Sequence, residues 1–119
     1  RKAMHPKEII QLQQLFIKAR MDINFTQEHE FLLALNKKDR VIGGLFYLDQ
    51  SDEMVYMDKV VVSESHRGGG VSRGLINEFV NRMRNAKKKM ITTGFLHPGF
   101  FYKFGFTIEK DQGGLAKYL

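Results

Sequence analysis

Apolar positions recur along the chain with two different periods, and the change between them predicts where helices and strands lie. Residues 5–20 show helical spacing, with a proline suited to the first turn. The apolar face of this helix carries Ile9, Leu12, Phe16 and Ala19. Residues 31–63 instead predict three strands, separated by polar, turn-rich segments at 36–40 and 49–53. Because these connections are short, we expect an antiparallel meander.

The second half of the chain predicts one long helix and several short elements. Apolar residues four apart form a stripe, and neighbouring apolar residues widen it. This pattern indicates an amphipathic helix that ends at the lysine run 87–89. Its stripe consists of Val71, Leu75, Ile76, Phe79, Val80 and Met83. Further on we expect a strand over 90–96, a helical turn over 98–105, a strand over 106–110 and a last edge strand over 113–119. This order predicts an α+β domain, a mixed sheet with helices covering its faces.

Length and composition indicate a single globular domain. The chain has 119 residues, of which 43% are hydrophobic and 27% charged. No apolar run could span a bilayer and no signal-peptide pattern is present, so we expect a cytoplasmic location and no membrane partner. The lack of cysteine excludes disulfides, thiolate metal sites and a cysteine nucleophile, and we expect no metal. Because the first residue is not Met, one interpretation of residues 1–119 is a domain of a longer protein.

The net charge of +6 favours an anionic partner, whether nucleic acid, a phosphorylated cofactor or an acidic substrate. Apart from residues 87–89 the charge is scattered, so it does not choose among these partners. A surface pattern of interleaved aromatic and basic residues, typical of single-strand binding, is missing from the sequence. Nucleic acid is therefore the least favoured partner.

A glycine-rich turn before the long helix carries the strongest chemical signal. Gly68, Gly69 and Gly70 lie between Arg67 and Arg73. Glycine adopts positive φ, which can aim successive backbone N–H groups at one point, and a helix N-terminus favours anions. The combination predicts a cradle for phosphate or pyrophosphate. An ordinary flexible loop is the alternative; the lysine and hydroxyl of a Walker loop are missing.

Two sequence blocks resemble those of the GNAT N-acetyltransferase superfamily. Residues 62–72, VSESHRGGGVS, are similar to its acyl-CoA-binding signature Arg/Gln-x-x-Gly-x-Gly/Ala, with Arg67, Gly70 and Ser72 at the defined positions. Residues 100–106, FFYKFGF, are similar to its FYxKxGF block. Ser72 in place of Gly or Ala, and Glu64 in place of the usual proline, are departures from the pattern. The two blocks have the order and separation of the family, whose strand and helix pattern covers essentially the whole chain.

The resemblance implies a central, mostly antiparallel sheet with a V-shaped splay, flanked by helices on both faces. In the family, the pantetheine arm of acetyl-CoA lies in the splay and the pyrophosphate lies on the glycine turn. The positions expected to bind the cofactor are Val60, Val61, Val62, Arg67, Gly68, Gly69, Gly70, Val71, Ser72 and Arg73. The strand that usually precedes the first helix is not expected in residues 1–119, and it normally helps to shape the acceptor pocket.

In this family an amine attacks the thioester directly, so the enzyme supplies an acid and a base rather than a nucleophile. Tyr102 aligns with the tyrosine that protonates the leaving thiolate; the alternative is an aromatic residue that only packs. Asp58 is the expected base, since a carboxylate within a β-branched strand is either exposed or functional. The alternative is an exposed Asp58 paired with Lys59 or with a neighbouring strand. Other candidates for the base are Glu53, Glu64 and His66, or a water molecule.

The expected function is transfer of an acetyl group from acetyl-CoA to a primary amine. We expect a small-molecule amine or amino acid as acceptor, with a protein or peptide amine as the alternative. Residues 56–65, YMDKVVVSES, are also locally similar to the acetyltransferase domains of N-acetylglutamate synthases, which favours an amino acid. A non-catalytic acyl-CoA-binding or regulatory module of a larger protein is the competing function, and an RNA-binding domain comes third. Homodimer formation through the first hairpin is left open.

Overall fold

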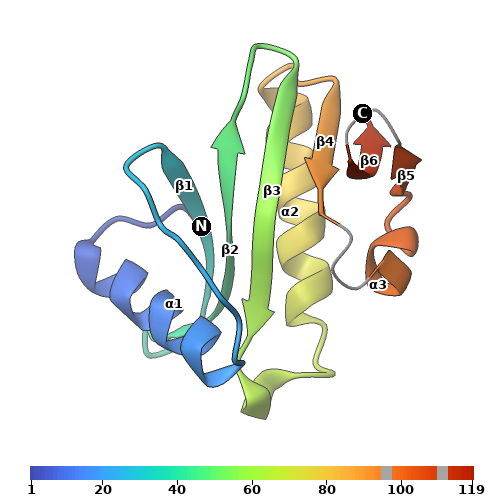
Figure 1. Ribbon diagram of the computed structural model, residues 1–119. Coiled ribbons are helices and arrows are strands. Elements are labelled where there is room, and N and C mark those ends of the chain that lie inside the picture. The colour runs from blue at the N-terminus through green and yellow to red at the C-terminus, as the bar shows by residue number, and fades with distance from the viewer. Residues whose placement is uncertain (95–97, 110–112) are drawn as a thin grey trace.

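The structure is a computed structural model that describes residues 1–94, 98–109 and 113–119. Within these residues, six strands form one sheet, accompanied by three α-helices and a short 3₁₀ turn (Figure 1). In chain order the elements are α1 (Pro6–Lys18), β1 (His29–Leu35), β2 (Val41–Asp49), β3 (Met54–Val62), η1 (Glu64–His66), α2 (Val71–Asn85), β4 (Met90–Thr93), α3 (Pro98–Tyr102), β5 (Thr107–Glu109) and β6 (Gly114–Tyr118). None of the helices described is long and apolar enough to cross a membrane.

The strand order is β1-β2-β3-β4-β6-β5, and all neighbouring strands are antiparallel except β3 and β4. The predicted meander is confirmed as β1, β2 and β3, although its first strand already begins at His29. Helix α2 makes the crossover between the parallel strands β3 and β4. The mixed, mostly antiparallel sheet expected from the sequence is therefore observed.

The last strand does not lie at the sheet edge, so that part of the prediction is wrong. Strand β6 pairs with β4 on one side and with β5 on the other, which makes β5 the edge. Leu115 and Ala116 of β6 are fully buried, whereas Ile108 of β5 is exposed, and an interior position for β6 therefore buries more apolar surface. Gly114 permits this close fit, because a Cβ there would lie 2.2 Å from the carbonyl oxygen of Thr93. The predicted strand ends at 95–96 and 110 lie outside the described residues.

Two apolar clusters lie on opposite faces of the sheet, one beneath each long helix (Figure 1). The cluster on the α1 side consists of Leu12, Phe16, Phe31, Leu33, Val41, Phe46 and Val61. The larger cluster on the α2 side includes Leu45, Tyr47, Val55, Met57, Val62, Leu75, Ile76, Phe79, Val80, Met83 and Phe101. The apolar faces predicted for both helices are thus confirmed, and the sheet between them is buried from both sides.

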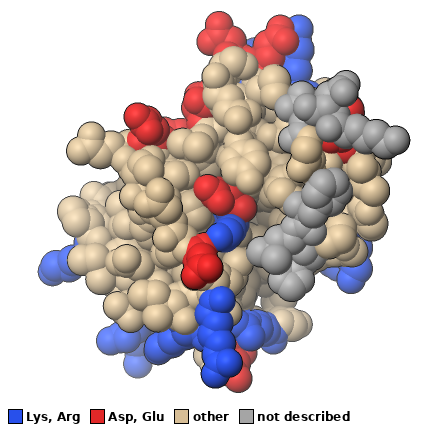
Figure 2. Space-filling view, in the orientation of Figure 1, with Lys and Arg blue, Asp and Glu red and all other residues tan. Residues whose placement is uncertain are grey.

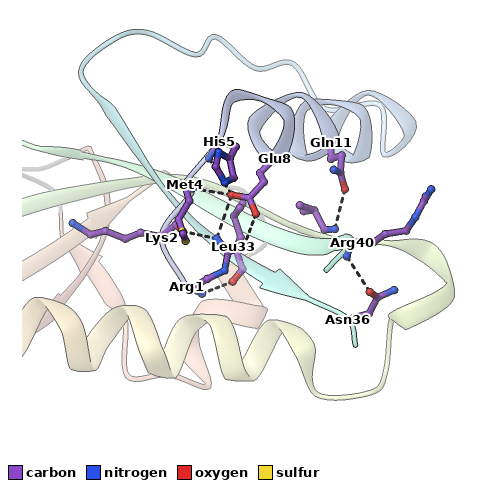
Figure 3. A network of polar contacts seen from close by, with 10 residues as sticks. Arg1, Lys2, Met4, His5, Glu8, Gln11, Leu33, Asn36 and Arg40 are labelled. Atoms are coloured by element: carbon purple, nitrogen blue, oxygen red, sulfur yellow. Dashed lines mark hydrogen bonds and ion pairs between the residues drawn. The ribbon is translucent and has the colours of Figure 1, made fainter. Parts of the chain in front are cut away.

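A network of hydrogen bonds around Glu8 holds the start of α1 (Figure 3). Its Oε1 accepts the backbone N–H groups of Met4 at 2.8 Å and His5 at 3.2 Å, and Nη1 of Arg1 at 3.2 Å. Its Oε2 accepts Nη2 of Arg1 at 2.6 Å. The hydrogen bond from Arg1, followed by that from Met4, lowers the pKa of Glu8 to about 2. Both oxygens of this carboxylate are therefore used to tie the helix to the segment before it.

Candidate active site between the separated strands

Strands β3 and β4 pair over only three positions and then separate. The pairs are Met54–Met90, Val55–Ile91 and Tyr56–Thr92. Just past the last pair, the buried hydroxyl of Thr93 donates to the carbonyl oxygen of Met57 at 2.8 Å. Among the residues that the structure describes, no strand pairs with this side of β3 beyond Tyr56. The V-shaped splay expected in the sheet is therefore confirmed (Figure 1).

A β-bulge lies in β3 at Asp58, beside the point of separation. Met57 and Lys59 pair with consecutive residues of β2, so Asp58 between them has no partner in that ladder. The extra residue changes the alternation of the strand. Before the bulge the odd-numbered Val55 and Met57 belong to the cluster on the α2 side. After the bulge the even-numbered Val60 and Val62 belong to it, and Val61 packs on the α1 side. The bulge thus releases Asp58 from both strand pairing and core packing.

The turn that leads into α2 has the positive φ predicted for it at two of its three glycines. The φ angle is 82° at Gly68 and 84° at Gly70, the N-cap of α2. The first backbone hydrogen bond of α2 runs from the N–H of Gly74 to the carbonyl of Gly70, so the helix does not use the amides before it. A Cβ added at Gly68 or Gly70 would meet no heavy atom within 4 Å. The open turn therefore fits an anionic group such as a pyrophosphate.

A cavity of about 560 Å³ extends from the separated strands to this turn. The predicted site residues that line it are Asp58, Val60, Val61, Val62, Arg67, Gly68, Val71 and Ser72. The predicted site residues outside its lining are Gly69, Gly70, Arg73 and Tyr102. The remaining lining residues are Met21, Lys59, His66, Gly99, Phe100 and Phe101. Most of the lining is apolar, which suits the aliphatic part of a ligand whose anionic end lies at the turn.

The carboxylate of Asp58 contacts a histidine that the sequence analysis did not consider. Its Oδ2 lies 3.2 Å from Nε2 of His29, and Nδ1 of the same ring accepts the backbone N–H of Thr26 at 3.0 Å. A backbone N–H can only donate, so Nδ1 carries the lone pair and Nε2 donates its proton to Asp58. The pairing of Asp58 with Lys59 is not observed, because Nζ of Lys59 donates instead to the carbonyl oxygen of Asp22. The contact to another strand that was the second form of this alternative is observed, with His29 of β1 as the partner.

The other candidates for the base are engaged or lie elsewhere. Glu53 forms an ion pair with Lys89 at 3.1 Å, and Glu64 is exposed in η1. His66 lines the cavity, but its Nδ1 lies 2.7 Å from Oγ of Ser63. Among the described residues, no other carboxylate than that of Asp58 lines the cavity, and no group of side chains could hold a metal ion.

Two tyrosines belong to the surroundings of the cavity. Tyr102, the predicted acid, ends α3 and is 48% exposed, and its neighbour Phe101 lines the cavity. Tyr56, which the sequence analysis did not single out, is the last residue of β3 that pairs with β4. Burial and then the negative charge of Asp58 raise the pKa of Tyr56, so its phenol keeps its proton at neutral pH. The assignment of Tyr102 as acid stays a prediction.

Positive charge gathers beside the glycine turn. Figure 2 shows Lys and Arg side chains along the lower edge of the molecule, where Figure 1 places the end of α1 and the η1 turn. A second hollow, of about 640 Å³, is lined there by Lys18, Arg20 and Arg67, together with residues 62–65. The Nε of Arg67 also donates to the carbonyl oxygen of Val62 at 3.2 Å, which fixes the start of the turn. The net charge of the chain thus has a local focus that favours a phosphorylated ligand.

Comparisons with known proteins agree with this architecture. A family model described as the acetyltransferase (GNAT) domain matches residues 27–108. Tetrahymena Gcn5 superposes with a TM-score of 0.82 at 22% identity, covering 94% of this chain and 86% of that one. YhbS, a GNAT family N-acetyltransferase from Escherichia coli in complex with CoA, gives 0.78 at 18% identity, covering 99% and 79%. An aminoglycoside 6'-N-acetyltransferase complexed with coenzyme A gives 0.73 at 15% identity, covering 96% and 92%. No curated protein sequence matches the chain.

Proposed function

The chain belongs to the GNAT acetyltransferase family, and on that premise we propose that it transfers an acetyl group from acetyl-CoA to a primary amine. One observation carries the proposal: a single cavity joins the open glycine turn to the carboxylate of Asp58. The turn offers donors for the phosphates of the cofactor, and Asp58 offers a base at the other end. Two of the structures with this fold are N-acetyltransferases in complex with coenzyme A, which supports both the cofactor and an amine acceptor.

The proposed binding of acetyl-CoA follows the free side of β3. Residues 59–62 present backbone groups that no described strand uses on that side, and these bind the pantetheine arm as an added strand would. The amides of residues 68–72 bind the pyrophosphate, whereas the amide of Arg67 already donates to the carbonyl oxygen of Glu64 at 3.4 Å. Arg73, with the cations at the end of α1, attracts the remaining phosphate. The bound cofactor supplies the thioester whose carbonyl carbon the amine attacks.

Asp58 is proposed to act as the base. Its carboxylate removes a proton from the amine, so that the nitrogen lone pair is free for attack. As the new C–N bond forms and the C–S bond breaks, the leaving sulfur needs a proton. Tyr102 is proposed to supply that proton from its phenol at the end of α3. The chain contains no cysteine, in keeping with direct attack by the acceptor instead of a covalent enzyme intermediate.

The proposed acceptor is a small-molecule amine or an amino acid, with a protein or peptide amine as the alternative. Asp58 lies in the cavity beside residues 59–62, so the acceptor amine must reach the same end of the cavity as the thioester. A carboxylate at that end favours a cationic amine before its proton is removed.

Calorimetric titration with acetyl-CoA tests the cofactor site. We expect micromolar binding by the unmodified chain and its loss in Gly70→Glu, which places a negative charge on the turn. Gly113→Glu is the matched control, because Gly113 also has positive φ (66°) and a Cβ there would have no atom of the described residues within 4 Å. Both variants place the same charge at a glycine of positive φ, so binding lost in Gly70→Glu alone identifies the turn. Failure of the unmodified chain to bind at millimolar acetyl-CoA contradicts the proposal.

Turnover with a panel of amines and amino acids then tests catalysis. Tyr102→Phe removes the proposed acid and should lower kcat about 10²- to 10⁴-fold. Tyr118→Phe, an exposed tyrosine of β6, is the control and should leave kcat unchanged. Binding of acetyl-CoA without turnover on any amine would instead favour the non-catalytic acyl-CoA-binding module.

A further inference from the structure

We propose that His29 is a positioning residue for Asp58: it holds one carboxylate oxygen so that the other is presented to the acceptor amine. The inference rests on the proposed function, in which Asp58 is the base. It adds a residue from β1, outside both sequence blocks that resemble the family. The evidence is the geometry of the imidazole and of the carboxylate that it contacts.

The imidazole of His29 is fixed on three sides. Its Nδ1 accepts the N–H of Thr26, and its Nε2 lies 3.2 Å from Oδ2 of Asp58. The ring also packs edge-on against Phe46, with centroids 5.0 Å apart and an interplanar angle of 69°. The side chain of His29 is only 5% exposed. A ring held in this way keeps one orientation. A residue that positions the carboxylate of Asp58 needs such a fixed orientation.

His29 is not itself placed to take the proton of the acceptor. The lone pair of its ring lies on Nδ1, which the N–H of Thr26 already occupies. His29 does not line the cavity of about 560 Å³ between the separated strands and the glycine turn, which we call the main cavity. Together with Thr26 it borders a separate hollow of about 330 Å³. Asp58 does line the main cavity, and its side chain is 26% exposed. Its Oδ1 has no hydrogen-bond partner among the described residues, so this oxygen is available to the amine.

The bulge in β3 makes this contact across the sheet. His29 and Asp58 lie on β1 and β3, and β2 separates these strands. Asp58 has no partner in the ladder with β2, which leaves its side chain to reach the histidine. Two titratable neighbours of Asp58 along β3 do not hold its carboxylate: the phenol of Tyr56 stays neutral, and Nζ of Lys59 is directed to the carbonyl oxygen of Asp22. Among the described residues, His29 is therefore the side chain that holds the carboxylate of Asp58 by a hydrogen bond.

In the proposed step, Oδ1 of Asp58 accepts a proton from the amine while Oδ2 keeps its hydrogen bond to Nε2 of His29. The amine nitrogen bonds to the acetyl carbon, the bond from that carbon to sulfur breaks, and the sulfur takes a proton from the phenol of Tyr102. The second proton that the nitrogen gives up passes to the phenolate of Tyr102, which restores the acid. His29 neither gains nor loses a proton in this sequence. Its contribution is to restrict the carboxylate to one orientation.

Steady-state kinetics of two His29 variants test this role, with the best amine of the panel. His29→Phe keeps a planar ring but removes the donor, and kcat should fall about 10- to 100-fold, as expected for loss of one hydrogen bond to a charged group. The KM for acetyl-CoA and the calorimetric affinity for it should not change. His29→Gln retains an N–H donor and should restore most of the lost kcat. In an Asp58→Asn background, His29→Phe should cause no further loss, whereas a general structural role would lower kcat again.

Nitrogen NMR of the unmodified chain gives a test that needs neither a variant nor turnover. The resonances of His29 should report Nδ1 without a proton and Nε2 with one; the reverse tautomer overturns the proposal. If Asp58→Asn abolishes turnover while His29→Phe does not alter kcat, the positioning role is refuted and the proposed function stands. If the unmodified chain binds acetyl-CoA but acetylates no amine, the proposed function fails, and the positioning role fails with it.

Discussion

Glu8 at the start of α1 and Asp58 in the middle of β3 both accept a hydrogen bond from a basic side chain, but they differ in how many of their oxygens are occupied. Both oxygens of Glu8 are bound, by Arg1 and by two backbone N–H groups (Figure 3). Among the residues that the structure describes, His29 binds one oxygen of Asp58 and none binds the other, and Asp58 lines the main cavity. Glu8 is a buried residue of the first turn of α1 and does not line that cavity.

The difference separates a structural carboxylate from one that can perform chemistry. Donors on every side stabilise the charge of Glu8 and lower its pKa to about 2, so this group does not exchange protons near neutral pH. A carboxylate with one fixed and one free oxygen keeps a defined direction and can still accept a proton. Counting the donors around each carboxylate thus distinguishes the two roles where residue type and a nearby basic group do not.

The largest expected effect is on catalysis. Asp58→Asn should lower kcat about 10²- to 10⁴-fold, because the amide cannot accept the proton of the amine. Calorimetric affinity for acetyl-CoA should be retained, since the glycine turn is unchanged. Glu8→Gln is the comparison variant, and initial rates with the same amine should match those of the unmodified chain. Equal rates in Asp58→Asn and the unmodified chain would remove Asp58 from the role of base.

The second expected effect is on stability, and here Glu8→Gln rather than Asp58→Asn should show the larger change. Because the folded state lowers the pKa of Glu8 from its ordinary value near 4.5 to about 2, its charge stabilises the fold above that ordinary value. This stabilisation is lost as the pH falls from about 4.5 to about 2. Thermal unfolding should therefore show a lower Tm for Glu8→Gln at pH 7, with the difference from the unmodified chain shrinking across this window.

Glu78→Gln provides the control for that experiment. Glu78 pairs with Arg82 at 3.3 Å on the surface of α2, with 49% of its side chain exposed. An exposed pair of this kind contributes little to stability, so Tm should hardly change at any pH. A Tm loss in Glu78→Gln as large as that in Glu8→Gln would show that the number of donors around the carboxylate is not what matters.

The smallest expected effect concerns Tyr56. Burial is the main reason that the pKa of Tyr56 is raised, and the charge of Asp58 is the second. Asp58→Asn should therefore lower the pKa of Tyr56 slightly but leave it above the ordinary value for tyrosine. Tyr47 is the internal control: burial and then Glu30 raise its pKa to about 12, so it should not respond. Titration followed by NMR of labelled tyrosines measures both pKa values. An unchanged pKa of Tyr56 in Asp58→Asn would show that the charge of Asp58 does not act on this phenol.

Local sequence was sufficient for the part of the molecule that is proposed to bind the cofactor. The glycines of residues 68–70, the valines before them and the amphipathic stripe after them are consecutive in the chain. Their conformations follow from short-range rules: positive φ at glycine, a helix beginning after the turn, and apolar spacing. The structure gives positive φ at Gly68 and Gly70 and starts α2 at Val71. The amides of this turn could therefore be predicted without tertiary contacts.

The surroundings of Asp58 depend on contacts between segments far apart in the chain. Its chemical type and its place in a strand could be read from the sequence, but its hydrogen-bond partner could not. His29 lies on another strand, and no local sequence pattern links the two residues. The position of β6 inside the sheet likewise depends on Gly114 meeting Thr93. The sequence by itself determined the elements, their order and the conformation of the glycine turn, since these depend on neighbouring residues. Only the tertiary structure decided which oxygen of Asp58 is held and which is free, because strand pairing and the bulge bring β1 and β3 together across β2.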